Sequence, residues 1–208
     1  MNNVALYGFR PYRCLATPGV IRKSVATAYQ AQDDGTSFSV DLNIGDPLQL
    51  VSTGTVALAN TTVACYGVLA GVAPYWDGTR MAIGNKLPGG TTWGTVEERR
   101  SYVYVYPAEN WIFEVDVDDN VTATTRAAYQ AFVGENCTHT CVGDTTSAEA
   151  RPLLDISLHA TTAGLVWRIV DISDSMYNQD YSGTRVKLLV QANITQAPGQ
   201  AATTIAGV

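Results

Sequence analysis

Residues 101–117, SYVYVYPAENWIFEVDV, decide the fold class of this chain. Tyrosine and valine alternate over residues 102–106, and apolar and acidic side chains alternate over residues 113–117. A period of two residues is typical of strands that bury one face. Because residues 107–110 (PAEN) separate the two runs as a turn would, we predict a β-hairpin with one aromatic face.

Further strands are predicted on both sides of this hairpin. Residues 38–44 (FSVDLNI) alternate apolar and polar side chains, and residues 45–47 (GDP) are typical of a turn. Residues 65–73 (CYGVLAGVA) are small and apolar throughout, which predicts a central strand. In that strand Gly67 and Gly71 allow a bulge or close packing. The other predicted strands cover residues 48–51, 56–59, 153–158, 165–172 and 185–191.

One short helix is predicted, over residues 126–133 (RAAYQAFV). Thr122 or Thr124 is placed to cap its start, and Gly134 is placed to end it in a left-handed conformation. Its buried side would consist of Ala128, Tyr129, Phe132 and Val133. Many short strands and one helix predict an all-β fold, either a distorted β-barrel or a sandwich.

The predicted organisation is one β-rich body with extended ends. Residues 1–19 contain prolines and aromatic residues without a lasting period, which predicts an extended N-terminal arm. The body covers residues 20–192 and includes a long loop or loose hairpin at residues 74–100. Residues 193–208 are predicted to form a C-terminal tail that a neighbour would have to order.

Composition excludes several classes of partner. Only 15% of the 208 residues are charged, against about 25% in typical soluble domains. A weakly charged surface suits proteins that pack side by side. It is equally consistent with a threonine-rich β protein that has no such packing role. The net charge of −6 argues against a nucleic-acid partner. Without a secretion-signal pattern or a long apolar run, we expect no membrane partner and a protein made and used in the cytoplasm.

Two clusters contain side chains of the types that bind metals. Cys137, His139 and Cys141 lie at alternate positions, but the spacing of a zinc site and a second ligand pair are absent, so we expect reduced thiols or a small disulfide. Asp116, Asp118, Asp119 and Asn120 lack the spacing of a calcium loop, so we expect a solvated strand end. The prediction is therefore that the chain holds no metal and no cofactor.

Signatures of catalysis are missing from the sequence. There is no nucleophile elbow, no HExxH motif and no phosphate-binding loop. Carboxylates that are distant in sequence can still pair in a glycosidase, and that alternative stays open. The prediction is that the chain is not an enzyme.

Three segments together resemble a known family. They are residues 7–12 (YGFRPY), residues 44–56 (IGDPLQLVSTGTV) and residues 67–72 (GVLAGV). In this order they are similar to the opening half of the capsid decoration, or cement, proteins of tailed bacteriophages. Residues 153–157 and 167–169 fit the same outline less distinctively.

The resemblance implies a virion structural protein on the outer capsid surface, assembled in the host cytoplasm. Such proteins bridge neighbouring major capsid subunits, often as trimers, and stabilise the DNA-filled head. The partners implied are the major capsid protein and further copies of the chain itself.

Aromatic and arginine side chains dominate many interfaces, and this indicates which residues dock. An isolated arm cannot bury its own rings, so the arm requires a groove on a partner or on this chain. If the groove is a partner's, deleting residues 1–19 leaves a folded body that no longer occupies heads; if it is the chain's own, the truncated protein aggregates or unfolds. The candidate partner-binding residues are Tyr7, Phe9, Arg10, Pro11, Tyr12, Arg13, Trp76 and Trp93.

Two alternatives belong to other functional classes. Trp76, Trp93 and the tyrosine-rich hairpin would suit a carbohydrate- or receptor-binding module of a phage head or tail fibre, with the rings stacking on sugars. The other alternative is an internal or minor component of the head.

Overall fold

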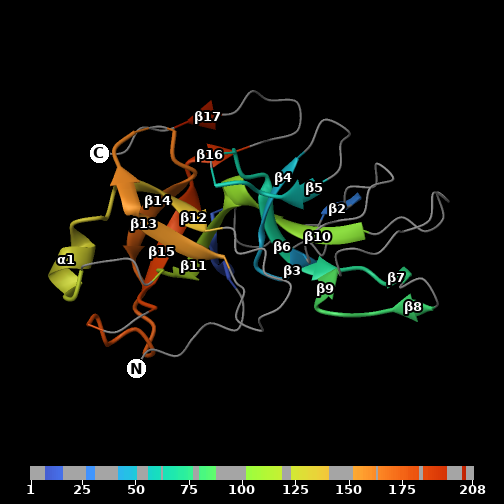
Figure 1. Ribbon diagram of the computed structural model, residues 1–208, viewed down its shortest axis with the longest axis horizontal. Helices are drawn as coiled ribbons and strands as arrows, with labels where there is room; N and C mark the ends of the chain where they lie inside the picture. The colour runs from blue at the N-terminus through green and yellow to red at the C-terminus, as the bar shows by residue number, and fades with distance from the viewer. Residues whose placement is uncertain are drawn as a thin grey trace.

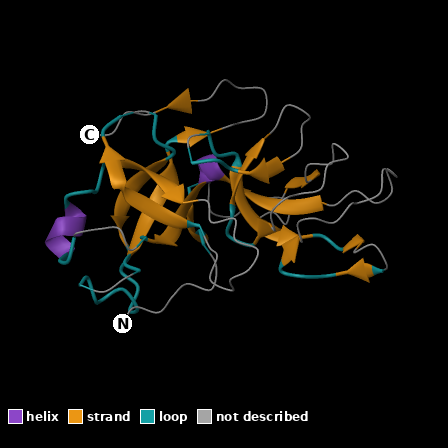
Figure 2. Cartoon of the chain, in the orientation of Figure 1, coloured by secondary structure: helices purple, strands orange, loops and turns teal. Residues whose placement is uncertain are grey.

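The computed structural model describes residues 8–15, 27–30, 42–50, 56–61, 63–76, 80–87, 102–118, 123–140, 152–162, 164–182, 185–195 and 203–204. Within these residues the chain is built of strands, with one short α-helix and one 3-10 turn (Figure 2). This confirms the predicted all-β class. Two antiparallel sheets hold most of the strands and lie side by side (Figure 1).

The larger sheet has six strands in the order β1-β11-β15-β14-β12-β13. All of its pairings are antiparallel. The N-terminal strand β1 is therefore one edge of the sheet, and β13 is the other. The strands are β1 (Arg10–Cys14), β11 (Trp111–Asp116), β12 (Asn136–Thr140), β13 (Leu153–Ala160), β14 (Trp167–Ile172) and β15 (Lys187–Ala192).

The smaller sheet has five strands in the order β2-β10-β6-β4-β5. Its middle strand is β6 (Gly67–Val72), which confirms the prediction of a central strand there. Gly67 permits a close approach in this strand, because a Cβ atom on it would lie 2.4 Å from the backbone oxygen of Tyr106. The other strands are β2 (Thr27–Gln30), β4 (Pro47–Leu50), β5 (Val56–Leu58) and β10 (Tyr102–Pro107).

Three short strand pairs complete the described fold. The pair β7–β8 extends away from the two sheets (Figure 1) and falls within the predicted loop of residues 74–100, of which residues 77–79 and 88–100 lie outside the described part. The six strands are β3 (Leu42–Asn43), β7 (Tyr75–Trp76), β8 (Met81–Ala82), β9 (Lys86–Leu87), β16 (Ile194–Thr195) and β17 (Thr203–Thr204).

The prediction that residues 101–117 form a hairpin is wrong. Both strands exist, but β10 belongs to the five-stranded sheet and β11 to the six-stranded sheet. Between them the 3-10 turn η2 (Ala108–Asn110) carries the chain from one sheet to the other. Ala108 is fully buried there, and its N–H donates to the carbonyl oxygen of Tyr66 at 3.1 Å. The turn is thus held by the neighbouring sheet and cannot close a hairpin.

Each sheet has its own apolar core. The six-stranded sheet buries the larger one, and Cys65 and Val68 reach into it from the five-stranded side. Its largest buried side chains are Phe9, Phe113, Leu154, Ile156, Trp167, Ile169 and Ile172. The second core is built on Leu42, Leu48, Val56, Leu69, Leu87, Val103 and Val105.

The helix α1 (Arg126–Gln130) lies where the sequence predicts it and is shorter than predicted. Its cap is Thr125, not Thr122 or Thr124: the Thr125 hydroxyl accepts a hydrogen bond from the N–H of Ala128 at 3.2 Å. Gly134 has a φ of 94°, which confirms the left-handed stop. No helix of the described residues is both long and apolar enough to cross a membrane.

Candidate functional site

Phe9, predicted to contact a partner, instead occupies the core of the six-stranded sheet. Its ring is 1% exposed and stacks on the Trp167 ring at a centroid distance of 4.4 Å. The rings of Phe113 and His139 meet it edge-on at 6.4 and 6.1 Å. The chain itself therefore supplies the groove for this aromatic residue, as the second interpretation of the arm required.

Gly8 and Gly45 explain how the chain enters this core. A Cβ atom on Gly8 would lie 2.3 Å from the Cγ of Pro152, so only glycine fits there. The Phe9 N–H donates to the Gly45 carbonyl at 3.0 Å, and the Gly45 N–H donates to the Leu69 carbonyl at 2.9 Å. Gly45 also has a φ of 93°. The three segments that carry the family resemblance thus meet at one junction.

Arg10 is held by a buried carboxylate. Its guanidinium forms an ion pair with Glu114, whose side chain is 7% exposed. The other oxygen of Glu114 accepts a hydrogen bond from the Ser173 hydroxyl at 2.5 Å. A carboxylate that is both ion-paired and hydrogen-bonded is a strong anchor for the start of β1.

Most of the remaining residues of the described arm face outward. Pro11, Tyr12 and Arg13 are exposed, Tyr12 by 53%, and Leu15 beyond the strand is 44% exposed. Tyr12 is also the extra residue of a β-bulge, because Pro11 pairs with Phe113 while Arg13 pairs with the adjacent Ile112. We call Pro11, Tyr12, Arg13 and Leu15 the β1 edge patch.

The structure leaves part of the predicted set undescribed. Tyr7 and Trp93 lie outside the described residues, and of Trp76 only the backbone is described, in β7. Of the predicted aromatic hairpin, Tyr102 and Tyr104 on β10 are exposed by 43% and 39%. They lie two positions apart on the same strand, so they share one face of β10, and the predicted platform with Trp76 and Trp93 stays a prediction.

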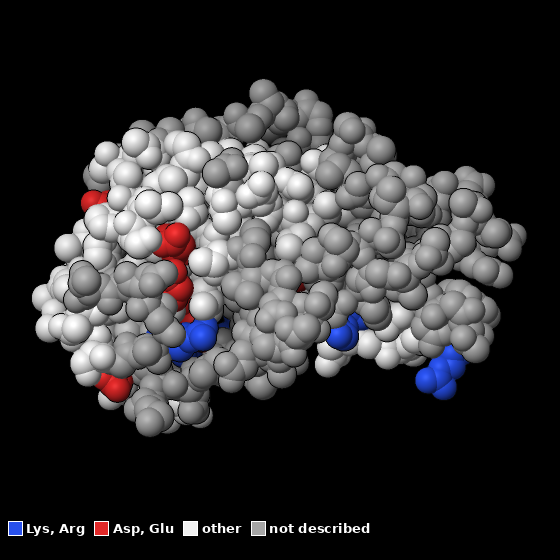
Figure 3. All heavy atoms as spheres, viewed as in Figure 1, with Lys and Arg blue, Asp and Glu red and all other residues white. Residues whose placement is uncertain are grey.

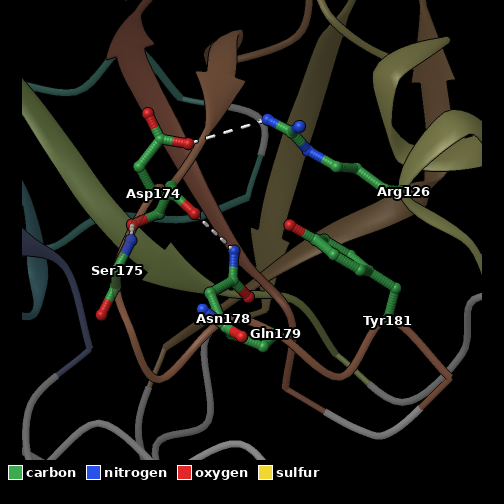
Figure 4. Close-up of a pocket in the computed structure, with 7 residues that line it drawn as sticks. Arg126, Asp174, Ser175, Asn178, Gln179 and Tyr181 are labelled. Carbon is green, nitrogen blue, oxygen red and sulfur yellow. Dashed lines mark hydrogen bonds and ion pairs between the residues drawn. The ribbon is translucent and has the colours of Figure 1, made fainter.

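A polar cleft that the sequence did not indicate lies between α1 and the loop after β14. Its volume is about 260 Å³. In Figure 4, Arg126 and Tyr181 lie on one side of the cleft and Asp174 and Ser175 on the other. The lining residues are Arg126, Ser173, Asp174, Ser175, Asn178, Gln179 and Tyr181.

Asn178 fixes the shape of the loop that lines the cleft. It is 2% exposed, and its amide donates to the carbonyl oxygens of Ser173 and Lys187 at 2.8 and 2.9 Å. Its own oxygen accepts from the Lys187 N–H at 2.8 Å. Arg126 and Asp174 form an exposed ion pair across the cleft at 3.7 Å (Figure 4). The cleft is therefore formed before any ligand arrives.

The described part of the predicted acidic group, Asp116 at the end of β11 and Asp118, is not a solvated strand end. Asp116 is buried and forms an ion pair with Lys187 at 3.3 Å, with both side chains nearly inaccessible. Asp118 is also buried, while Asp119 and Asn120 lie outside the described residues. Lys187 directly faces Asp116 in the β11–β15 ladder and supplies its counter-charge. Sequence spacing does not reveal this pairing.

His139 and Cys137 are both buried in the core. The Trp167 indole N–H donates to the His139 Nδ1 at 3.1 Å, so the ring proton is on Nε2, which faces the Ala59 carbonyl at 3.4 Å. Burial raises the pKa of the Cys137 thiol, and Asp155 raises it further. No group of three metal-binding side chains occurs among the described residues; Cys141 is not one of them.

His139 makes stability depend on pH. Burial lowers its pKa from 6.5 to about 4, although the Ala59 hydrogen bond opposes the shift. The unfolded chain therefore binds a proton at a higher pH than the folded chain does. The contribution of His139 to the free energy of unfolding is therefore fully present above pH 6.5. As the pH falls toward 4, the free energy of unfolding decreases by up to about 3 kcal/mol.

Urea unfolding at pH 7 and at pH 4.5 measures this loss. The variant His139→Gln is expected to lose less stability between the two pH values than the wild-type protein does. The variant Gln130→Ala, which changes an exposed side chain without a titratable group, is the control and is expected to keep the wild-type difference. An unchanged difference in His139→Gln would contradict the assignment.

Comparisons with known proteins return no match: no family model, no curated protein and no solved structure is similar to this chain.

Proposed function

We propose that this chain is a virion structural protein that decorates the outer surface of a tailed-phage capsid. In this proposal it cements neighbouring major capsid subunits and stabilises the DNA-filled head, with no catalytic role. It is assembled onto the head in the host cytoplasm and remains on the virion surface. The support from sequence is the resemblance carried by residues 7–12, 44–56 and 67–72.

The observation that carries the proposal is the β1 edge patch. β1 is the outermost strand of its sheet and pairs with β11 alone among the described strands, so its other side offers backbone hydrogen-bonding groups. Tyrosine and arginine are the residue types that contribute most to many interfaces. An edge strand with exposed Tyr12, Arg13 and Leu15 suits a partner that adds an extended segment to the sheet.

The patch is held rigidly, which reduces the entropy lost on binding. Phe9 is packed in the core immediately before β1, and Arg10 is ion-paired to the buried Glu114. After the strand, the Leu15 N–H donates to the Asn110 carbonyl at 2.8 Å. Side chains on an element fixed at both ends need little further ordering when a partner binds.

Low charge supports packing against a protein shell. Most of the described surface in Figure 3 is neither acidic nor basic. Each charge at such an interface would have to be desolvated or paired. A weakly charged surface therefore reduces the desolvation penalty of packing side by side. Contacts repeated over many equivalent capsid sites, and between copies within a trimer, would make modest individual contacts collectively strong.

The double variant Tyr12→Ala/Arg13→Ala tests the proposal. It removes the two largest side chains of the β1 edge patch without touching the core. We expect its affinity for expanded heads that lack this protein to fall at least about tenfold. Co-sedimentation of purified protein with such heads, followed across a concentration series, measures the affinity.

The matched control is Tyr177→Ala/Arg126→Ala, which replaces an exposed tyrosine and an exposed arginine outside β1. We expect this control to bind heads as the wild-type protein does. Equal binding by both double variants would remove the β1 edge patch from the proposal. Absence of binding by the wild-type protein would remove the cement function altogether.

A further inference from the structure

The polar cleft beside α1 has a lining that selects among classes of ligand. Among the described lining residues only Arg126 and Asp174 are charged, and their charges cancel. An anion would face the Asp174 carboxylate and a cation would face the Arg126 guanidinium, so neither is favoured. The lining is mostly polar, so a purely apolar ligand would leave these groups without hydrogen bonds. The chemistry therefore favours a neutral, polar ligand.

Hydrogen-bonding capacity narrows the ligand further. The side chains of Arg126 and Gln179 offer N–H donors, Asp174 offers acceptors, and the hydroxyls of Ser175 and Tyr181 do both. The side chains of Arg126, Asp174 and Tyr181 point toward a common space from opposite sides (Figure 4). A ligand that carries several hydroxyl groups, each a donor and an acceptor, matches this mixture better than one that carries donors or acceptors alone.

Size and shape agree with one sugar ring. The cleft volume of about 260 Å³ is just below the range of roughly 300–1,000 Å³ typical of sites for drug-sized ligands. The Tyr181 ring is backed by the Tyr129 ring at a centroid distance of 6.2 Å, and its hydroxyl points into the cleft (Figure 4). An aromatic ring held in this way can pack against the C–H face of a sugar while its hydroxyl hydrogen-bonds.

The loop that lines the cleft is also anchored to buried polar groups of the six-stranded sheet. Asn178 ties the loop to the backbone of β15, and the Ser173 hydroxyl donates to the buried Glu114. Loop residues that are fixed by buried hydrogen bonds keep their positions when a ligand arrives, which favours binding.

We infer that this cleft is a saccharide-binding site that takes one neutral pyranose ring. Arg126, Asp174 and Gln179 bind the sugar hydroxyls, and Tyr181 packs against the ring. This activity is independent of capsid binding, because the cleft contains no residue of the β1 edge patch. It would give a protein on a virion surface a way to hold glycans.

Saturation-transfer difference NMR with full-length protein tests the inference. The probes are glucose, galactose, mannose and N-acetylglucosamine, each at millimolar concentration, so that binding with a dissociation constant of about 1 mM is detected. We expect saturation transfer to at least one of these sugars. In the double variant Asp174→Ala/Gln179→Ala the signal should fall at least fivefold, because both replaced side chains bind sugar hydroxyls.

Matched controls separate the cleft from the rest of the surface. Gln130→Ala and Tyr177→Ala replace an exposed glutamine and an exposed tyrosine outside the lining, and both should keep the wild-type signal. No transfer to any of the four sugars, or a signal that survives in the double variant, would overturn the inference. Loss of head binding by Asp174→Ala/Gln179→Ala would also overturn it, because the cleft would then be a capsid contact.

Discussion

Replacing Phe9 with alanine is expected to lower the free energy of unfolding by about 3–5 kcal/mol. The Phe9 ring is fully buried and stacks on Trp167, with Phe113 and His139 at its edges. The three neighbouring rings are closely packed and cannot move far enough to fill the space that the Phe9 ring leaves, so the variant carries a cavity. Urea unfolding followed by tryptophan fluorescence measures the change.

The matched control lies three residues further along the same segment. Tyr12→Ala removes an aromatic side chain of similar size that is largely in solvent, and its effect on stability is expected to be within about 0.5 kcal/mol. Equal effects of the two variants would show that Phe9 is not a core residue. By the same reasoning, deletion of residues 1–19 removes an edge strand and a core ring, so we expect the truncated protein to aggregate.

Strands were predictable because their signal is local. The alternation in residues 102–106 and the apolar run of residues 65–73 each reflect which side of one strand is buried. Observed strands β10 and β6 lie at these positions. The helix end was predictable for the same reason, since Gly134 takes a backbone conformation that glycine adopts most readily.

Strand partners could not be predicted, because pairing depends on distant residues. The turn at residues 107–110 resembles a hairpin turn in sequence. In the structure, however, the Ala108 N–H donates a hydrogen bond to the carbonyl oxygen of Tyr66, just before β6 of the five-stranded sheet. The sequence indicated that Phe9 needed a groove, but the groove is formed by β11, β12 and β14, more than a hundred residues away. Whether an aromatic residue is an anchor for a partner or for its own core is therefore decided only by the fold.

The polar cleft illustrates the same limit for a site. Arg126, the first residue of α1, lines the cleft on one side. The other lining residues follow β14, nearly fifty positions later in the sequence. The loop sequence SDSMYNQDYS, residues 173–182, is rich in polar side chains, which is common in loops and carries no specific signal. Its distinguishing feature is Asn178, whose buried hydrogen bonds to Ser173 and Lys187 are visible only in three dimensions.

The variant Asp116→Ala is expected to lower the free energy of unfolding by about 3–5 kcal/mol. Asp116 and Lys187 face each other across β11 and β15, 3.3 Å apart, and both side chains are almost inaccessible to solvent. Removing the carboxylate leaves the buried ammonium of Lys187 without this counter-charge, and a charge out of water is costly unless it is paired. Urea unfolding at pH 7 measures the loss.

The exposed ion pair at the cleft provides the control. Asp174→Ala also removes a carboxylate from an ion pair, with Arg126, but both side chains are mostly in solvent, so we expect a loss below about 1 kcal/mol. The double variant Asp116→Leu/Lys187→Met, which removes both buried charges, should recover much of the stability lost in Asp116→Ala. If it were as unstable as Asp116→Ala, the loss would come from altered packing in the β11–β15 ladder, and the unpaired charge would not be its cause.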